Sequence, residues 1–235
     1  MSARGSTDAG QNHILSKLPA GDLALLTPGL SPVDLPLRKP LETPNKLIDH
    51  VYFIESGFAS VVANGNDRSI EVGLIGSEGM TGLAVLMGAD RTPNATYMQL
   101  AGKGLRIASA NLRKAMTQSE TLHRLLLRYG HAFVVQTAHT ALANGRNKVE
   151  ERLARWLLMA HDRIDGDDLA ITHEFMSIML GVRRAGVTVA LDTLENKGFV
   201  RARRGGVVIL NRKGLEGITN GAYGAPEAEF KRLWG

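Results

Sequence analysis

The residues with the clearest chemical potential are basic, and they are concentrated in one segment. Residues 183–213 contain eight Lys and Arg residues against only Asp192 and Glu195, so this segment carries +6 while the whole chain carries +5. Guanidinium groups pair with phosphates, and an arginine fork also fits the O6 and N7 acceptors of guanine. On charge alone, a duplex-DNA partner and an ordinary solvated surface are equally open, and the helices and hairpin predicted for this segment decide between them.

The sequence lacks the residues that several kinds of catalytic site require. The 235-residue chain has no cysteine, which excludes disulfides, thiolate metal sites, cysteine-ligated iron–sulfur clusters and a cysteine nucleophile. His50 is the only histidine between residues 14 and 122, and no Gly-x-Ser-x-Gly elbow or Walker phosphate loop occurs. We therefore expect no enzyme, no metal site and no cofactor. A β-barrel metal enzyme of the cupin type, with His and carboxylate ligands, is the alternative from another class.

Two short predicted helices position the first of the basic residues. Thr172 is a plausible cap for a helix of about two turns that ends at Gly181, and a second helix is predicted from Arg183 to Asn196. We call residues 183–196 the reading helix. Its inward face is predicted to hold Val187, Ala190, Leu191 and Leu194. Two helices joined by a tight glycine turn form a helix-turn-helix, whose second helix enters the major groove of DNA.

A predicted β-hairpin carries the remaining basic residues. Phe199–Arg203 and Val207–Leu210 are apolar or alternating runs on either side of Arg204-Gly205-Gly206, which makes an Arg-tipped wing after the reading helix. The side chains expected to contact DNA lie on both elements and on the preceding helix: Thr172, His173, Arg183, Arg184, Ala185, Thr188, Val189, Asp192, Arg201, Arg203 and Arg204.

Upstream of this module, helical patterns predominate. A long helix is predicted over 111–143, with a stripe at roughly heptad spacing that comprises Leu122, Leu126, Tyr129, Phe133, Gln136 and Thr140. The stripe favours a symmetric helix–helix contact in a homodimer, and burial against its own domain is the alternative. Asn144-Gly145 is predicted to break the helix. A further helix has an apolar face (Val149, Leu153, Trp156, Leu157, Ala160) and a polar face (Glu150, Glu151, Arg152, Arg155), and ends in a polar turn at 165–168.

The first half reads as short strands separated by glycines. Apolar or alternating runs at 51–54, 58–63, 70–75, 96–100 and 105–108 indicate an antiparallel sandwich or barrel. The proline-rich segment 28–44 is predicted to be a lead-in or an edge. Met1–Gly21 has no apolar core typical of a signal peptide, and no window reaches 18 apolar residues, so we expect a cytoplasmic protein that binds no membrane.

The stretch from Ile171 to Glu195 resembles the helix-turn-helix of the Crp/Fnr transcription regulators, the family of the cyclic-AMP receptor protein. The glycine-rich strands, the long helix and the segment Asn147–Arg155 follow the same order as in that family. The resemblance implies an α+β fold with a β-roll like a cyclic-nucleotide-binding domain (12–118), a dimerisation helix (119–145) and a winged helix-turn-helix (146–218). It also implies a homodimer on a near-palindromic site in double-stranded DNA, and it allows RNA polymerase as a further partner.

The chain departs from the family in its nucleotide cassette. The family places a glutamate, which holds the ribose, after a glycine, and an arginine, which holds the phosphate, some ten residues later. Here Met80 stands at the glutamate position and Pro93 at the arginine position, and Arg91 could serve only after a one-residue deletion. We therefore expect no response to cyclic AMP and leave the effector unidentified. The candidate ligand pocket comprises Gly79, Met80, Thr81, Gly82, Arg91, Thr92 and Asn94.

The reading helix departs as well. By the resemblance, Arg184 matches an arginine that contacts guanine, whereas Ala185 and Val189 replace a glutamate and a second arginine. Ala and Val offer only apolar contact, which is best met by a thymine methyl group, so a different operator follows. The expected phosphate contacts are His173, Arg183, Arg203 and Arg204. Asp192 would either accept from cytosine N4 or pair with a nearby arginine. A degenerate family member that binds a protein partner instead of DNA is the remaining alternative.

Overall fold

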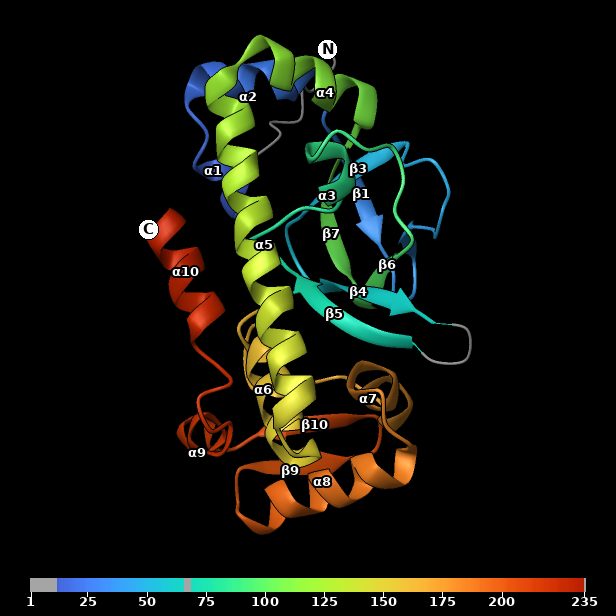
Figure 1. The fold of residues 1–235 in the computed structure, drawn as a ribbon, viewed down its shortest axis with the longest axis vertical. Helices are drawn as coiled ribbons and strands as arrows, with labels where there is room; N and C mark the ends of the chain where they lie inside the picture. The colour runs from blue at the N-terminus through green and yellow to red at the C-terminus, as the bar shows by residue number, and fades with distance from the viewer. Residues whose placement is uncertain (1–11, 66–68, 235) are drawn as a thin grey trace, which may run out of the picture. The chain divides into compact units, whose positions relative to one another are not determined.

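The computed structural model describes residues 12–65 and 69–234 (Figure 1). Residues 1–11, which begin the polar stretch Met1–Gly21, lie outside the described residues. The described strands form three sheets with the orders β1-β7-β3, β2-β6-β4-β5 and β8-β10-β9. The chain divides into two compact units: the first comprises Met1–Ala59, Ile75–Thr92 and Thr96–Arg128, and the second comprises Ser60–Leu74, Pro93–Ala95 and Tyr129–Gly235.

The elements before the long helix are short. The strands are β1 (Ser31–Leu35), β2 (Pro40–Glu42), β3 (His50–Ile54), β4 (Phe58–Asn64), β5 (Ser69–Ile75), β6 (Ala95–Leu100) and β7 (Gly102–Ala108). The helices are α1 (His13–Ser16), α2 (Ala20–Leu26), the 3-10 helix η1 (Thr27–Gly29), α3 (Leu83–Leu86) and α4 (Ser109–Gln118). Each of the strands predicted between residues 51 and 108 is present, and β1 and β2 are edge strands, as the proline-rich segment predicts.

Alternating apolar residues build the core of the first unit. β3 pairs with β7 in antiparallel register, which places Phe53 opposite Leu105 and Val51 opposite Ile107. These four side chains are at most 3% exposed. Burial of large apolar side chains contributes about 1.5–3 kcal/mol each to the stability of such a core.

The long helix is divided where the sequence predicts continuity. α4 ends at Gln118, α5 (Glu120–Arg146) begins two residues later, and Ser119 between them has extended backbone angles. Ser119 Oγ donates to Asp22 Oδ1 over 2.6 Å and accepts from the amide of Leu122, so it caps α5. α5 also continues through Asn144-Gly145, where the sequence predicts a break, and ends at Arg146 (Figure 1).

The second unit holds the remaining elements. They are α6 (Val149–His161), β8 (Asp168–Leu169), α7 (His173–Leu180), α8 (Arg184–Asn196), β9 (Val200–Arg203), β10 (Gly206–Ile209), α9 (Arg212–Ile218) and α10 (Ala225–Trp234). α6 packs against α7, α8 and α9 and buries Leu153, Trp156, Leu157 and Ala160 of its predicted apolar face. The predicted polar turn at 165–168 is wrong at its last residue, because Asp168 begins β8.

One predicted surface residue of α6 is buried. The helical pattern places Arg155 on the polar face of α6, but Arg155 is only 5% exposed. Its Nε donates to the carbonyl of Ala222 over 2.9 Å, and desolvation lowers the pKa of this guanidinium. The prediction is wrong because Ala222 lies in a carboxyl-terminal segment that the helical period of α6 cannot reveal. No helix among the described residues is both long and apolar enough to cross a membrane.

Candidate nucleic-acid interface

Residues 172–196 form two helices with a short turn between them. The hydroxyl of Thr172 accepts a hydrogen bond from the amide of Phe175 over 3.3 Å and caps α7. Gly181 ends α7 with a φ of +61°, in the left-handed region that favours glycine. Arg183 occupies the N-cap position of α8, which begins at Arg184, without a capping hydrogen bond from its side chain. The predicted helix-turn-helix is therefore confirmed.

α8 has one buried and one exposed face. Val187, Ala190, Leu191 and Leu194 are at most 2% exposed, which confirms the predicted inward face. Ala185, Thr188, Val189 and Asp192 are exposed, and Val189 is 65% exposed. An exposed valine beside an alanine gives the outward face an apolar patch, which is suited to a methyl group on a base.

Arg183 and Arg184 stand at the amino-terminal end of α8. Arg184 forms an ion pair of 3.3 Å with Glu174 on α7, and both side chains are more than half exposed. An exposed pair of this kind contributes at most about 1 kcal/mol, so Arg184 can exchange Glu174 for a base or a phosphate. Arg183 makes no ion pair with another described residue. Glu174 was not among the predicted site residues, although its position in the first turn of α7 is visible in the sequence.

The first turn of α7 contacts α8 through two further predicted residues. His173 Nδ1 and Thr188 Oγ1 lie 3.4 Å apart at an exposed position, and the Thr188 hydroxyl also lies 3.3 Å from the carbonyl oxygen of Arg184. Asp192 makes no ion pair with a described residue. Of the two partners expected for Asp192, an arginine of the same chain therefore finds no support.

The wing is a three-stranded sheet with a two-residue turn at its tip. β9 and β10 are neighbouring antiparallel strands (Figure 1). Arg203 is opposite Gly206, and Arg204-Gly205 forms the turn. Arg201 and Arg204 are exposed and make no ion pair with a described residue, whereas Arg203 Nε donates to Asp168 Oδ1 over 2.9 Å. Glu195 Oε1 accepts from the amide of Ala202 over 3.0 Å, so the end of α8 is tied to the wing.

The glycine-rich turn of the β-roll is filled by the chain itself. Met80 is fully buried and pairs with Phe53, and Thr81 Oγ1 accepts from the amide of Tyr52 over 3.0 Å. Gly82, with a φ of +80°, donates its amide to Glu42 Oε1 over 2.6 Å. Glu42 Oε2 accepts from Thr96 Oγ1, also over 2.6 Å. The backbone amide of Gly82 at this turn is therefore already hydrogen-bonded to a carboxylate from β2.

The remaining predicted pocket residues make contacts of their own within the chain. Arg91 is exposed and paired with Asp90 over 2.9 Å, and the carbonyl of Thr92 accepts from the amide of Asn45. Asn94 is partly buried, and Gly79 accepts a hydrogen bond from Asn12 through its carbonyl. Burial raises the pKa of the Glu42 carboxyl, while the hydrogen bonds from Thr96 and Gly82 oppose this shift. Sequence reasoning missed Glu42, since no local motif marks it.

The predicted dimer stripe faces the interior of its own chain along most of its length. Leu122, Leu126, Tyr129, Phe133 and Gln136 are at most 9% exposed, and Thr140 is partly buried. Gln136 Oε1 accepts from the amide of Leu74 over 2.6 Å, so this amide side chain is engaged within the protomer. A different set of α5 residues is exposed: His131, Val134, Ala138 and Ala141 lie at heptad spacing, and Leu142 is exposed next to Ala141.

A buried carboxyl that the sequence does not reveal joins β5 to α6 within the second unit. Glu71 is 4% exposed, its Oε1 accepts from Trp156 Nε1 over 2.8 Å, and Ser60 Oγ donates to its Oε2 over 2.6 Å. Burial raises the pKa of Glu71 to about 8, although these hydrogen bonds and the charges of Arg155 and Arg163 lower it. The group is therefore largely protonated at pH 7.

Comparison with known proteins identifies the fold. Residues 151–218 match the family model of the Crp-like helix-turn-helix domain. No curated protein sequence matches the chain at a significant level. Among solved structures, a protein from Eubacterium rectale assigned to the Crp/Fnr family of transcriptional regulators is 18% identical, with a TM-score of 0.71 over 88% of this chain and 97% of that one.

Two further structures agree. A CRP-family transcriptional regulator from Thermus thermophilus is 19% identical, with a TM-score of 0.68 over 82% of this chain and 99% of its own. The c-di-GMP-responsive regulator CLP of Xanthomonas campestris is 19% identical, with a TM-score of 0.65 over 81% of this chain and 99% of its own. All three are described as regulators, and the proteins from Eubacterium rectale and Thermus thermophilus as transcriptional regulators. The predicted resemblance and fold class are therefore confirmed, and the chain has the DNA-binding fold of Crp/Fnr-type regulators.

Proposed function

We propose that the protein is a sequence-specific transcription regulator that binds double-stranded DNA as a homodimer on a near-palindromic operator and does not respond to cyclic AMP. The observation that carries this proposal is the exposed surface formed by α8 and the wing. Every residue expected to contact DNA is exposed, and the surface combines arginines with an apolar patch at Ala185 and Val189. As such a regulator, the protein would act in the cytoplasm, with RNA polymerase as a further partner that the family resemblance allows.

Base readout is assigned to the outward face of α8. Arg184 would leave Glu174 and bind the O6 and N7 atoms of a guanine, while Ala185 and Val189 contact thymine methyl groups. Asp192 would accept from cytosine N4, since no arginine of the described chain pairs with it. His173, Arg183, Arg203 and Arg204 would bind phosphates, and Arg203 would do so from a position fixed by Asp168.

The homodimer is assigned to the exposed heptad stripe of α5. Val134 and Leu142 are about half exposed, and Ala138 and Ala141 allow close approach of a second helix. Two copies of α5 packed along this stripe would bury these side chains in a two-fold contact. The two reading helices would then meet half-sites about 34 Å apart. This face replaces the stripe that begins at Leu122, because the first stripe is occupied within the protomer.

The absence of a response to cyclic AMP is supported by Glu42. A nucleotide in the β-roll turn would have to displace the Glu42 carboxylate from the Gly82 amide, and its phosphate would be repelled by that carboxylate. Met80 and Pro93 also lack the groups that hold ribose and phosphate in the family. Cyclic AMP at millimolar concentration is therefore expected to leave the melting temperature unchanged. A clear upward shift would refute this part of the proposal.

The decisive experiment is selection from random duplex DNA followed by binding measurements with Arg184→Ala. We expect a near-palindromic consensus with guanine at one position of each half-site. Arg184→Ala should weaken binding by about 1–3 kcal/mol per half-site and relax the preference at that position. Arg124→Ala, which removes an equally exposed arginine on α5, is the control. Unchanged DNA affinity of Arg184→Ala would instead favour a regulator that acts through protein partners.

A further inference from the structure

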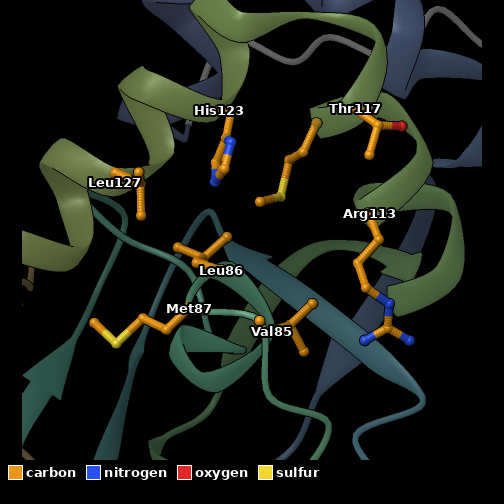
Figure 2. A pocket seen from close by; sticks show the side chains of 9 residues that line it. Val85, Leu86, Met87, Arg113, Thr117, His123 and Leu127 are labelled. Atoms are coloured by element: carbon orange, nitrogen blue, oxygen red, sulfur yellow. The ribbon is translucent and has the colours of Figure 1, made fainter.

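We propose that a cavity bounded by α3, α4 and α5 in the first unit binds an amphipathic carboxylate of the size of a medium-chain fatty acid. The cavity has a volume of about 500 Å3, which is typical of small-molecule sites (Figure 2). All of its lining residues belong to the first unit. The proposal goes beyond DNA binding and does not depend on it.

Apolar side chains from all three helices form most of the wall. Val85 and Leu86 come from α3, Met116 from α4 and Leu127 from α5. Leu127 is 41% exposed, and Met87, which follows the last residue of α3, is 57% exposed. An alkyl chain in this cavity would remove its own surface and that of these side chains from water, which favours binding.

Positive charge is present without a competing carboxylate in the wall. Arg113 from α4 is always charged, and His123 from α5 offers a ring N–H in either tautomer. None of the lining residues, all within the described part of the chain, is acidic. Figure 2 shows His123 extending toward the space above Leu86, and Arg113 at the side of the cavity near Val85.

The guanidinium of Arg113 is available to a ligand. It is partly buried and makes no hydrogen bond or ion pair with another described residue. The charge of Arg113 affects the carboxyl of Asp90. The pKa of Asp90 is lowered mainly by the hydrogen bond from Arg91 and only in small part by Arg113. A carboxylate could therefore form the two parallel hydrogen bonds that an arginine fork favours, with its alkyl chain along the apolar wall.

The test is calorimetric titration of the full chain with decanoate below its micellar concentration. We expect saturable binding of one decanoate per chain. Octanoate, with two fewer methylene groups, should bind about tenfold more weakly, and decanol should bind at least about tenfold more weakly because it lacks the charge. Arg113→Gln should lower the affinity for decanoate by about tenfold or more and leave the affinity for decanol unchanged. The control Arg124→Gln should change neither affinity.

Leu127→Asp provides a second variant at an exposed position, so it tests the site without disturbing a buried core. The added negative charge should abolish decanoate binding. Non-saturable uptake, equal affinity for decanoate and decanol, or full affinity in Arg113→Gln would each overturn the proposal. The competing occupant is a second copy of the chain, since Leu127 lies one heptad before Val134 on α5. If Leu127→Asp reduces self-association while decanoate affinity stays unchanged, the cavity is an interface between copies and the proposal fails.

Discussion

At the scale of single residues, Glu42 determines what the β-roll turn can hold. Its carboxylate accepts hydrogen bonds from the Gly82 amide and the Thr96 hydroxyl, each over 2.6 Å. Buried donors that lose an acceptor destabilise the folded state by about 1–3 kcal/mol each. We therefore expect Glu42→Ala to lower the free energy of unfolding in urea by at least about 1 kcal/mol, and Glu42→Gln to lower it less because the amide oxygen still accepts one bond.

The control for Glu42 is Glu120→Ala, since the Glu120 side chain is 85% exposed. Its effect should stay within about 0.5 kcal/mol, as for other surface substitutions. A loss in Glu42→Ala no larger than that of the control would mean that the two hydrogen bonds do not hold the turn in place.

At the scale of elements, Glu71 links the β4–β5 hairpin to α6. Its folded-state pKa of about 8 lies above its ordinary value of 4.5, so the folded chain retains a proton that the unfolded chain has lost between these pH values. Stability from this group is complete below about pH 4.5 and is lost as the pH rises through 8. The shift corresponds to at most about 5 kcal/mol. Denaturation in urea from pH 5 to 9 should show this decline.

Glu71→Gln isolates the contribution of that carboxyl. Glutamine keeps an acceptor for Trp156 and a polar group for Ser60 but has no charge, so the decline with pH should become shallower and the variant should exceed the original chain in stability at pH 9. Glu120→Gln, at an exposed position, should leave the pH profile unchanged. Parallel profiles for the original chain and Glu71→Gln would show that Glu71 does not titrate in this range.

From the exposed stripe of α5 we predict which substitution prevents two copies of the chain from associating. In a two-fold contact, Val134→Glu brings two like charges together, and we expect sedimentation to change from about twice the chain mass of 25.4 kDa to the monomer. Thr121→Glu, exposed on the same helix outside the stripe, should remain dimeric. A dimeric Val134→Glu would place the contact elsewhere.

The elements differ in how far their sequence determines them. Thr172 and Gly181 are local signals, so both helices of the DNA-binding module are predictable to within one residue. α5 has two apolar faces at heptad spacing, one with Phe133 and one with Val134, and periodicity cannot tell which of them the protomer itself covers. Other features of the structure depend on hydrogen bonds between residues that are distant in sequence, as for Arg155, Ser119, Glu42 and Glu71. No local sequence pattern predicts such contacts.

At the scale of the whole molecule, the charge excess predicts how DNA binding depends on salt. Arg183, Arg203 and Arg204 would neutralise about three phosphates per chain and six per dimer, so the logarithm of the binding constant should fall with the logarithm of salt concentration with a slope of about −5. Arg204→Ala should reduce the magnitude of that slope by about 2 and weaken all DNA sequences alike. A slope near zero would contradict DNA binding through this surface.

The apolar patch of α8 has a chemical consequence for the operator. In the proposed complex, Val189, which is 65% exposed, and Ala185 would contact the methyl group of thymine, because neither side chain can bind a hydrogen-bonding edge of a base. Deoxyuridine in place of the contacted thymines would remove that methyl group without altering base pairing, so binding should weaken. A 5-methylcytosine at the same position would restore the methyl group on a different base. The protein would then be sensitive to covalent modification of its DNA, a property that follows from two small side chains on one turn of helix.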